Sequence, residues 1–225
     1  TIIHVPIQFS YAKPTISPEV KKSNYLVKYK NEHHYFKDSV SVFIPEDTFY
    51  KDTFIDFEVT NGTVKIGSPT LAIKRNITLS IPNSSIAEEE RSRYFIASIE
   101  GSKLNYNKTY LKGKYFTLYT RNLGDFILAK DSIAPIIQPL NFEAGKWIST
   151  LPVLEVTISD DFSGIQSFNG FLNNQWILFE YDFKTNKLTH DFSDTIVIEG
   201  RNELKIIVVD NVGNSTIFET HFFRS

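Results

Sequence analysis

The chain of 225 residues contains no cysteine. This absence excludes disulfide bonds, catalysis by a thiolate and zinc sites built from cysteine ligands. It does not restrict the cellular compartment, because many exported bacterial proteins are stable without disulfides.

Long apolar segments and clusters of one charge are also missing. No run approaches the roughly 18 apolar residues that a membrane-spanning helix needs. The 24 basic and 26 acidic residues are scattered, and no basic stripe could neutralise a nucleic-acid backbone. We therefore expect a globular chain that neither spans a membrane nor binds nucleic acid. The sequence starts at Thr1 without a signal peptide, so either a signal peptide has been removed or the chain is a piece of a longer protein, and we favour the second.

Helical periodicity is scarce, whereas aromatic residues are abundant, with 19 Phe and 11 Tyr. Aromatic and β-branched side chains favour strands. Apolar and polar residues alternate with a period of two, as in a strand with one buried face, at residues 55–59, 77–81 and 154–158. Turn signals separate such runs. Asn61-Gly62 is the strongest, since both residues tolerate the positive φ of a type I′ hairpin turn.

Short strands at this spacing predict an all-β fold with two immunoglobulin-like β-sandwich domains in tandem. Residues 124–129 have the pattern of a closing strand. Residues 131–135 have that of a short connector, in which Pro135 biases Ala134 toward extended geometry. We therefore expect domains at 36–130 and 131–225. Residues 1–35 are expected to be a linker or strands that complete a preceding domain.

One histidine motif has a spacing found in zinc sites. His34 and Asp38 form H-x-x-x-D, which supplies two zinc ligands in lysostaphin-type peptidases. A zinc site needs about three converging protein ligands, and the H-x-H motif that completes such sites is missing. We interpret the pair as a coincidence and expect zinc only in a possible upstream domain.

The carboxylates allow a second kind of site. Asp160, Asp161 and Asp210 could hold calcium, or, with Asp182, form an acid–base pair. We favour a structural interpretation, because residues 160–165 and 210–214 have the composition of tight turns, in which Asp and Ser side chains cap backbone amides. The chain has no nucleophile elbow, phosphate-binding loop or nucleotide fingerprint. We therefore expect no catalytic residue and no cofactor in this chain.

Three Asp-Ser/Thr-aliphatic triplets resemble the O-glycosylation sequon of exported Bacteroidota proteins. Their acceptor hydroxyls would be those of Ser39, Ser132 and Thr195. They favour a cell-envelope location.

The last hundred residues resemble a known family most specifically. The resemblance rests on residues 160–165, 172–182, 209–215 and 222–224, and more weakly on 43–50 and 121–126. These stretches are similar to the C-terminal region of lysostaphin-type (LytM-like) zinc metallopeptidases of Bacteroidota. The resemblance implies a periplasmic or outer-membrane address and an accessory role. It supplies no zinc ligand or catalytic residue, because the catalytic domain of those proteins lies upstream.

The leading functional hypothesis is a non-catalytic scaffolding module that contacts other envelope or outer-membrane proteins, possibly within an outer-membrane assembly. One alternative is the targeting region of an active peptidoglycan endopeptidase, which intact upstream H-x-x-x-D and H-x-H motifs would favour. A glycan-binding module that uses Trp147, Trp176 and tyrosines is another. The sequence determines neither the partner nor the oligomeric state.

Two segments are apolar on both faces, beyond what one small core requires. In the first, Leu204, Ile206 and Val208 should face inward, so the residues between them face outward. The second is residues 176–179. We expect an interface surface built from five residues: Trp176, Ile177, Phe179, Ile207 and Val209.

Overall fold

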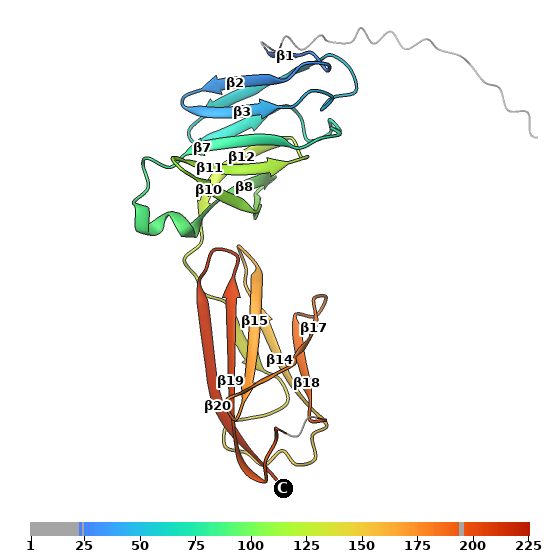
Figure 1. Ribbon diagram of the computed structural model, residues 1–225, viewed down its shortest axis with the longest axis vertical. Coiled ribbons are helices and arrows are strands. Elements are labelled where there is room, and N and C mark those ends of the chain that lie inside the picture. The colour runs from blue at the N-terminus through green and yellow to red at the C-terminus, as the bar shows by residue number, and fades with distance from the viewer. Residues whose placement is uncertain (1–22, 24, 194–195) are drawn as a thin grey trace, which may run out of the picture.

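The computed structural model describes residues 23, 25–193 and 196–225 (Figure 1). These residues form two β-sandwiches stacked end to end, with Ser225 at the end of the second sandwich that faces away from the first. Within the described residues the one helix is a short 3-10 helix, η1 (Glu88–Arg93). No helix there is long and apolar enough to cross a membrane. The predicted fold class, two immunoglobulin-like β-sandwiches in tandem, is confirmed.

The first sandwich packs two five-stranded antiparallel sheets against each other. One has the order β10-β11-β7-β3-β2, and its strands are β2 (His33–Lys37), β3 (Val40–Ile44), β7 (Ile77–Pro82), β10 (Thr109–Lys112) and β11 (Tyr115–Thr120). The other has the order β5-β6-β12-β8-β9, and its strands are β5 (Phe57–Thr60), β6 (Thr63–Ile66), β8 (Tyr94–Glu100), β9 (Lys103–Asn105) and β12 (Gly124–Lys130). A short pair, β1 (Tyr25–Val27) with β4 (Thr53–Ile55), closes one end.

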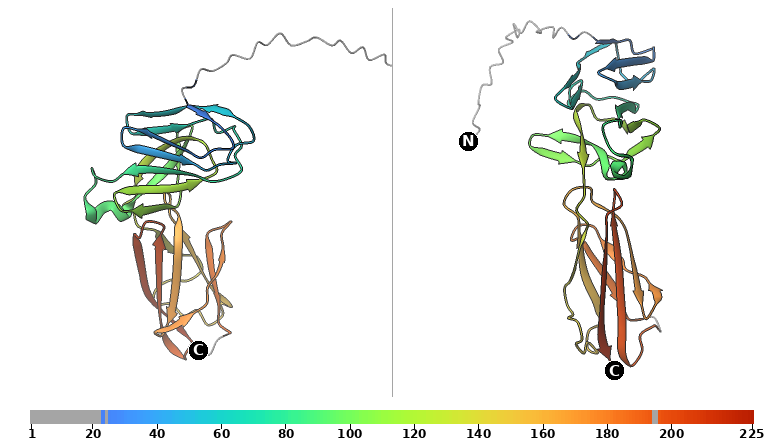
Figure 2. Two further views of the ribbon diagram at one scale, coloured as in Figure 1. Left: turned by 45° about the horizontal axis from the view of Figure 1, so that its top comes forward. Right: turned by 90° about the vertical axis from the view of Figure 1, so that its left-hand side faces the viewer.

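The second sandwich packs two four-stranded antiparallel sheets. One has the order β13-β14-β18-β17, with β13 (Ile136–Pro139), β14 (Val153–Ser159), β17 (Glu180–Asp182) and β18 (Lys187–Asp191). The other has the order β16-β15-β19-β20, with β15 (Ile165–Leu172), β16 (Gln175–Ile177), β19 (Gly200–Asp210) and β20 (Ser215–Arg224). Figure 2 shows the two layers of this sandwich and the long β19–β20 hairpin along one side.

The alternation in the sequence places side chains as predicted. Every second residue of β7 and β14 is buried, and each sandwich has its own apolar core. The inward side chains of β19, Leu204, Ile206 and Val208, are at most 1% exposed. The hairpin turn at Asn61-Gly62 is also confirmed, since both residues have positive φ (51° and 80°) between β5 and β6.

The strands of the first sandwich begin earlier than residue 36. Residues 25–27 pair with β4 and residues 33–37 pair with β3, and Val27 belongs to the first core. These residues therefore complete this sandwich and not a preceding domain. The pairing with β4 and β3 is a contact between separate segments, which the short runs at 25–27 and 33–37 do not encode by themselves.

Two residues expected at an interface lie in the second core. Ile177 and Phe179 are 2% and 5% exposed and pack in the core cluster of that sandwich. The cause is Gly170 on the neighbouring strand, which faces Ile177 in the register of β15 and β16. A Cβ atom built at Gly170 would lie 2.3 Å from Cε2 of Phe179. The missing side chain thus makes room for an aromatic ring inside the sandwich.

Gly170→Ala is therefore expected to destabilise the second sandwich by about 1–3 kcal/mol, the usual cost of overpacking a filled core. The added methyl cannot coexist with the present position of the Phe179 ring. Urea unfolding followed by tryptophan fluorescence measures this change. The control is Ser167→Ala, which alters an exposed position of β15, the strand that contains Gly170. Gly200→Ala is unsuitable as a control because Gly200 has a φ of 92°. An unchanged midpoint for Gly170→Ala would contradict the packing described.

Candidate functional site

The junction between the two sandwiches combines apolar packing with a cluster of aspartates. The apolar part is a small core cluster with Phe95, Ala97 and Ala129 from the first sandwich and Val212 from the second. The ring of Phe95 packs edge-on against Phe162 at 5.1 Å between centroids. The β19–β20 turn, which contains Val212, lies at the end of the second sandwich that faces the first (Figure 1). The two domains are therefore in direct contact.

Asp131 is the residue that begins the connector between the domains. Its amide donates to the carbonyl of Arg93 in the first sandwich (3.0 Å). Its carboxylate accepts from the N–H groups of Ile133 (3.0 Å) and Ser163 (3.1 Å), the latter in the second sandwich. Asp131 is 2% exposed. It thus joins the end of one domain to a loop of the next through backbone hydrogen bonds.

Asp160 and Asp210 order the two loops that meet this connector. Oδ1 of Asp160 accepts from the amides of Phe162 (3.1 Å) and Gly164 (2.6 Å), which confirms the predicted turn capping. Asp210 is fully buried, and its Oδ1 accepts from the amides of Val212 and Asn214 at 2.9 and 2.8 Å. One carboxylate oxygen each from Asp131, Asp160 and Asp210 lie within 4.8 Å of one another. Three segments distant in sequence therefore bring three carboxylates close together.

The three carboxylates that cluster in the structure differ in one residue from the calcium site considered from the sequence. Asp161 is exposed and is not one of the three clustered carboxylates, and Asp131 takes its place. The physical reason is the turn that Asp160 caps, because consecutive residues there point in different directions. The sequence signal for Asp131 was its position as the first residue of the connector. Its distance of about thirty residues from Asp160 hid the contact.

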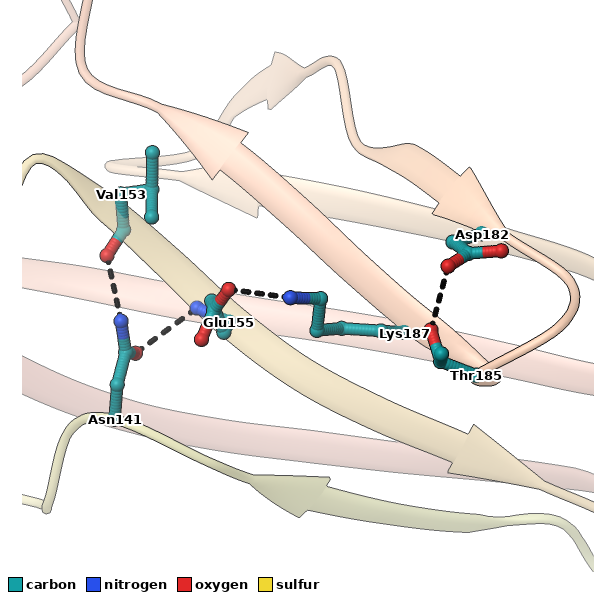
Figure 3. Close-up of polar contacts among 6 residues, drawn as sticks. All are labelled: Asn141, Val153, Glu155, Asp182, Thr185 and Lys187. Atoms are coloured by element: carbon teal, nitrogen blue, oxygen red, sulfur yellow. Dashed lines mark hydrogen bonds and ion pairs between the residues drawn. The ribbon is translucent and has the colours of Figure 1, made fainter.

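Asp182 stays apart from this cluster. Its carboxylate accepts from Oγ1 of Thr185 (2.8 Å) in the β17–β18 turn (Figure 3). It also accepts from the amide of Lys184 (3.0 Å). These hydrogen bonds, first that of Thr185, lower the pKa of Asp182. A carboxylate held ionised in a turn is not suited to act as a general acid. Its role is to order the hairpin.

In the same sheet, the side chains of Asn141 and Lys187 contact strand β14. The amide group of Asn141 donates to the carbonyl of Val153 and accepts from the N–H of Glu155, both at 2.9 Å (Figure 3). Lys187 on the neighbouring strand pairs with Glu155 at 2.6 Å. These contacts fix β14 and do not form a site for a ligand.

The aspartate cluster affects the pKa of one tyrosine of the first sandwich. The pKa of Tyr106 is raised, chiefly because the side chain is partly buried and further because of the negative charge of Asp210. Tyr106 also packs on Phe95 at 4.9 Å between ring centroids. The negative charge of Asp210 in the second sandwich therefore acts on a side chain of the first sandwich.

The H-x-x-x-D pair is not part of any metal-binding group found among the described residues. His34 is exposed on β2, where its ring packs against Phe36 and Phe43 at 4.8 and 5.3 Å. Asp38 lies in the β2–β3 turn with a positive φ of 49°. The two residues therefore act as parts of a strand and its turn.

The remaining interface candidates lie on the outer face of the β16-β15-β19-β20 sheet. Trp176 is 55% exposed, and Ile207 and Val209 are half-buried. The register adds Phe171 beside Trp176 and Ile217 beside Ile207. Ile217 is 55% exposed, and the adjacent apolar pair Ile217-Phe218 is the signal in the sequence that could have identified it. We call these five residues the outer patch: Phe171, Trp176, Ile207, Val209 and Ile217.

The other sequence-based candidates occupy surface positions. Trp147 is 63% exposed and packs on Phe223 at 5.3 Å between ring centroids. Ser39, in the β2–β3 turn, and Ser132, in the connector, are exposed. Thr195 lies outside the described residues.

Comparison with known proteins gives a family match for the first sandwich. No curated protein matches the chain. Among solved structures, the fibronectin(III)-like modules of CbhA from Clostridium thermocellum match with a TM-score of 0.32 and 12% sequence identity, covering 67% of this chain and 86% of that chain. A family model described as a Zu5-like domain matches residues 24–131. The first sandwich is therefore similar to Zu5-like domains.

Proposed function

We propose that this chain is a non-catalytic scaffolding module of a cell-envelope protein related to lysostaphin-type peptidases. In this role it contacts other proteins in the periplasm or at the outer membrane. Ser39 and Ser132 are exposed, so their hydroxyls are accessible to the O-glycosylation that an envelope address would bring. The contacts between the two sandwiches support a role as a spacer that presents a surface at a fixed distance.

The outer patch is the observation that carries this proposal. Its apolar side chains sit on four neighbouring strands of one sheet face, while the opposite face of the same sheet is already buried in the core. Two members, Trp176 and Ile217, are more than half exposed. Aromatic residues are enriched at the centres of protein interfaces. A protein partner with a complementary apolar surface fits this face.

Ile217→Glu is expected to lower recovery of the partner by about tenfold or more, because a charge buried at an apolar contact costs more than one hydrogen bond. The measurement is affinity purification of the tagged chain from solubilised envelope membranes, with the co-purified protein quantified. Ile198→Glu is the matched control, since Ile198 is 53% exposed and lies outside the outer patch.

Equal recovery with Ile217→Glu and the unchanged chain would contradict a docking role for this face. Equal losses with both variants would point to misfolding or general repulsion, and would contradict it as well. Sedimentation with purified peptidoglycan tests the glycan-binding alternative in parallel. Binding there that depends on Trp147, with no protein partner recovered, would favour that alternative.

A further inference from the structure

The aspartate cluster at the domain junction contains more oxygen atoms than its hydrogen-bond donors satisfy. Oδ1 of Asn214 and Oγ of Ser163 are buried and have no hydrogen-bond partner. The two residues are 4% and 2% exposed. Both belong to the cluster by contact, because Nδ2 of Asn214 donates to Oδ2 of Asp210 (2.6 Å), and the amide of Ser163 donates to Asp131.

The orphaned oxygen of Asn214 is the informative one. An amide oxygen only accepts hydrogen bonds, and a buried acceptor without a donor is costly. The carboxamide that carries it contacts two loops, since its Nδ2 also donates to the carbonyl of Asp131 (3.3 Å). A water molecule or a cation could satisfy this amide oxygen beside the carboxylates, but only a cation also offsets their negative charge.

The charge of the cluster points the same way. Asp131 and Asp210 are buried, and Asp160 is half-buried. Within the part of the chain that the structure describes, none of the three forms an ion pair with a Lys, Arg or His side chain. Buried carboxylates are normally paired or bound to metal. Backbone N–H groups stabilise each carboxylate separately but do not remove the repulsion between them.

From these observations we propose that Asp131, Asp160 and Asp210, with the side-chain oxygen of Asn214, bind one Ca²⁺ ion at the junction of the two sandwiches. Calcium binds oxygen at about 2.3–2.6 Å, so two of its ligands lie at most about 5 Å apart. The carboxylate oxygens, within 4.8 Å of one another, meet this limit. The donor set is all oxygen and irregular, which suits Ca²⁺ better than Zn²⁺ or Mg²⁺.

A calcium ion here joins the domains. Asp131 belongs to the connector that follows β12, whereas Asp160 lies in the loop after β14 and Asp210 ends β19 at its loop to β20, both in the second sandwich. The bound ion therefore holds the connector against these loops and restricts bending at the junction. It acts independently of the outer patch, so the docking role can fail while this proposal holds.

The test is calorimetric titration of Ca²⁺ into the full chain after treatment with a chelator. We expect a single site with a dissociation constant of about 1 mM or tighter, the range of extracellular calcium modules. At about ten times that constant, the thermal midpoint should rise by about 5–10 °C. Amide exchange at residues 131–133 should slow. Absence of both binding heat and a thermal shift would overturn the proposal and assign the orphaned oxygens to water.

Two variants with equal changes of charge locate the site. Asp160→Asn keeps an oxygen for the two amides that Oδ1 caps and removes one carboxylate, so Ca²⁺ affinity should fall by about tenfold or more. Asp161→Asn removes an adjacent, exposed carboxylate outside the cluster and should leave affinity unchanged. Equal losses in both variants, or an equal thermal shift with Mg²⁺, would mean general charge screening and would overturn the proposal.

Discussion

Phe222→Ala is expected to lower the unfolding free energy of the second sandwich by about 3–5 kcal/mol, the usual cost of deleting a buried aromatic side chain. Phe222 is fully buried on the inner face of β20. Its ring packs edge-on against Phe142 and Phe192 at 6.4 and 6.1 Å between centroids. Removing it leaves a cavity where three parts of the chain meet.

Tryptophan fluorescence reports this change selectively, because both tryptophans, Trp147 and Trp176, belong to the second sandwich. With a urea dependence of about 1–3 kcal/mol per M, the midpoint should fall by at least about 1 M. Leu79→Ala, at an equally buried position of the first core, is the control. If it lowered the fluorescence midpoint as much as Phe222→Ala does, the two cores would unfold as one unit and the domain-specific prediction would be wrong.

Asp210→Ala should also be strongly destabilising, by roughly 3 kcal/mol or more. Asp210 accepts three hydrogen bonds, from the amides of Val212 and Asn214 and from Nδ2 of Asn214. Alanine leaves these buried donors without an acceptor, at about 1–3 kcal/mol each before any water enters. The β19–β20 turn should loosen, and with it the contact between Asn214 and the connector at Asp131.

Asp210→Asn separates the loss of hydrogen bonds from the loss of charge. Its side-chain oxygen can still accept from the two backbone amides, so we expect it to cost clearly less than alanine. Both variants are measured by tryptophan fluorescence in the presence of a chelator, so that no bound cation contributes. If alanine were no worse than asparagine in these conditions, the carboxylate would not be the support of the turn.

These predictions separate the two roles of the junction. The aspartates order loops through backbone amides whether or not an ion is present, and the chelated protein measures that part. The calcium titration measures the remainder. A chain that is stable in chelator but stiffened by Ca²⁺ would have a junction whose rigidity depends on the calcium concentration of the surrounding medium.

Local pattern determined the fold class and many of the inward-facing residues. Alternation at residues 77–81 and 154–158 identified buried faces, because a strand on a core has a strict period of two. Asn61-Gly62 and residues 210–214 identified hairpin turns, because turn backbones require particular residues. These features depend on neighbours in the sequence, so the sequence alone contains them.

Contacts between distant segments were decided only in three dimensions. Ile177 and Phe179 have the same apolar pattern as a surface patch, and it is Gly170 on the next strand that opens a place for Phe179 in the core. Likewise, Asp160 and Asp161 are equivalent in the sequence, and the turn between β14 and β15 directs only one of them toward Asp131 and Asp210. The sequence by itself determined which residues could form sheets, turns and acidic loops. The tertiary structure decided which carboxylates meet, because the connector and two strand ends of the second sandwich come together only when the chain folds, and local periodicity does not encode that contact.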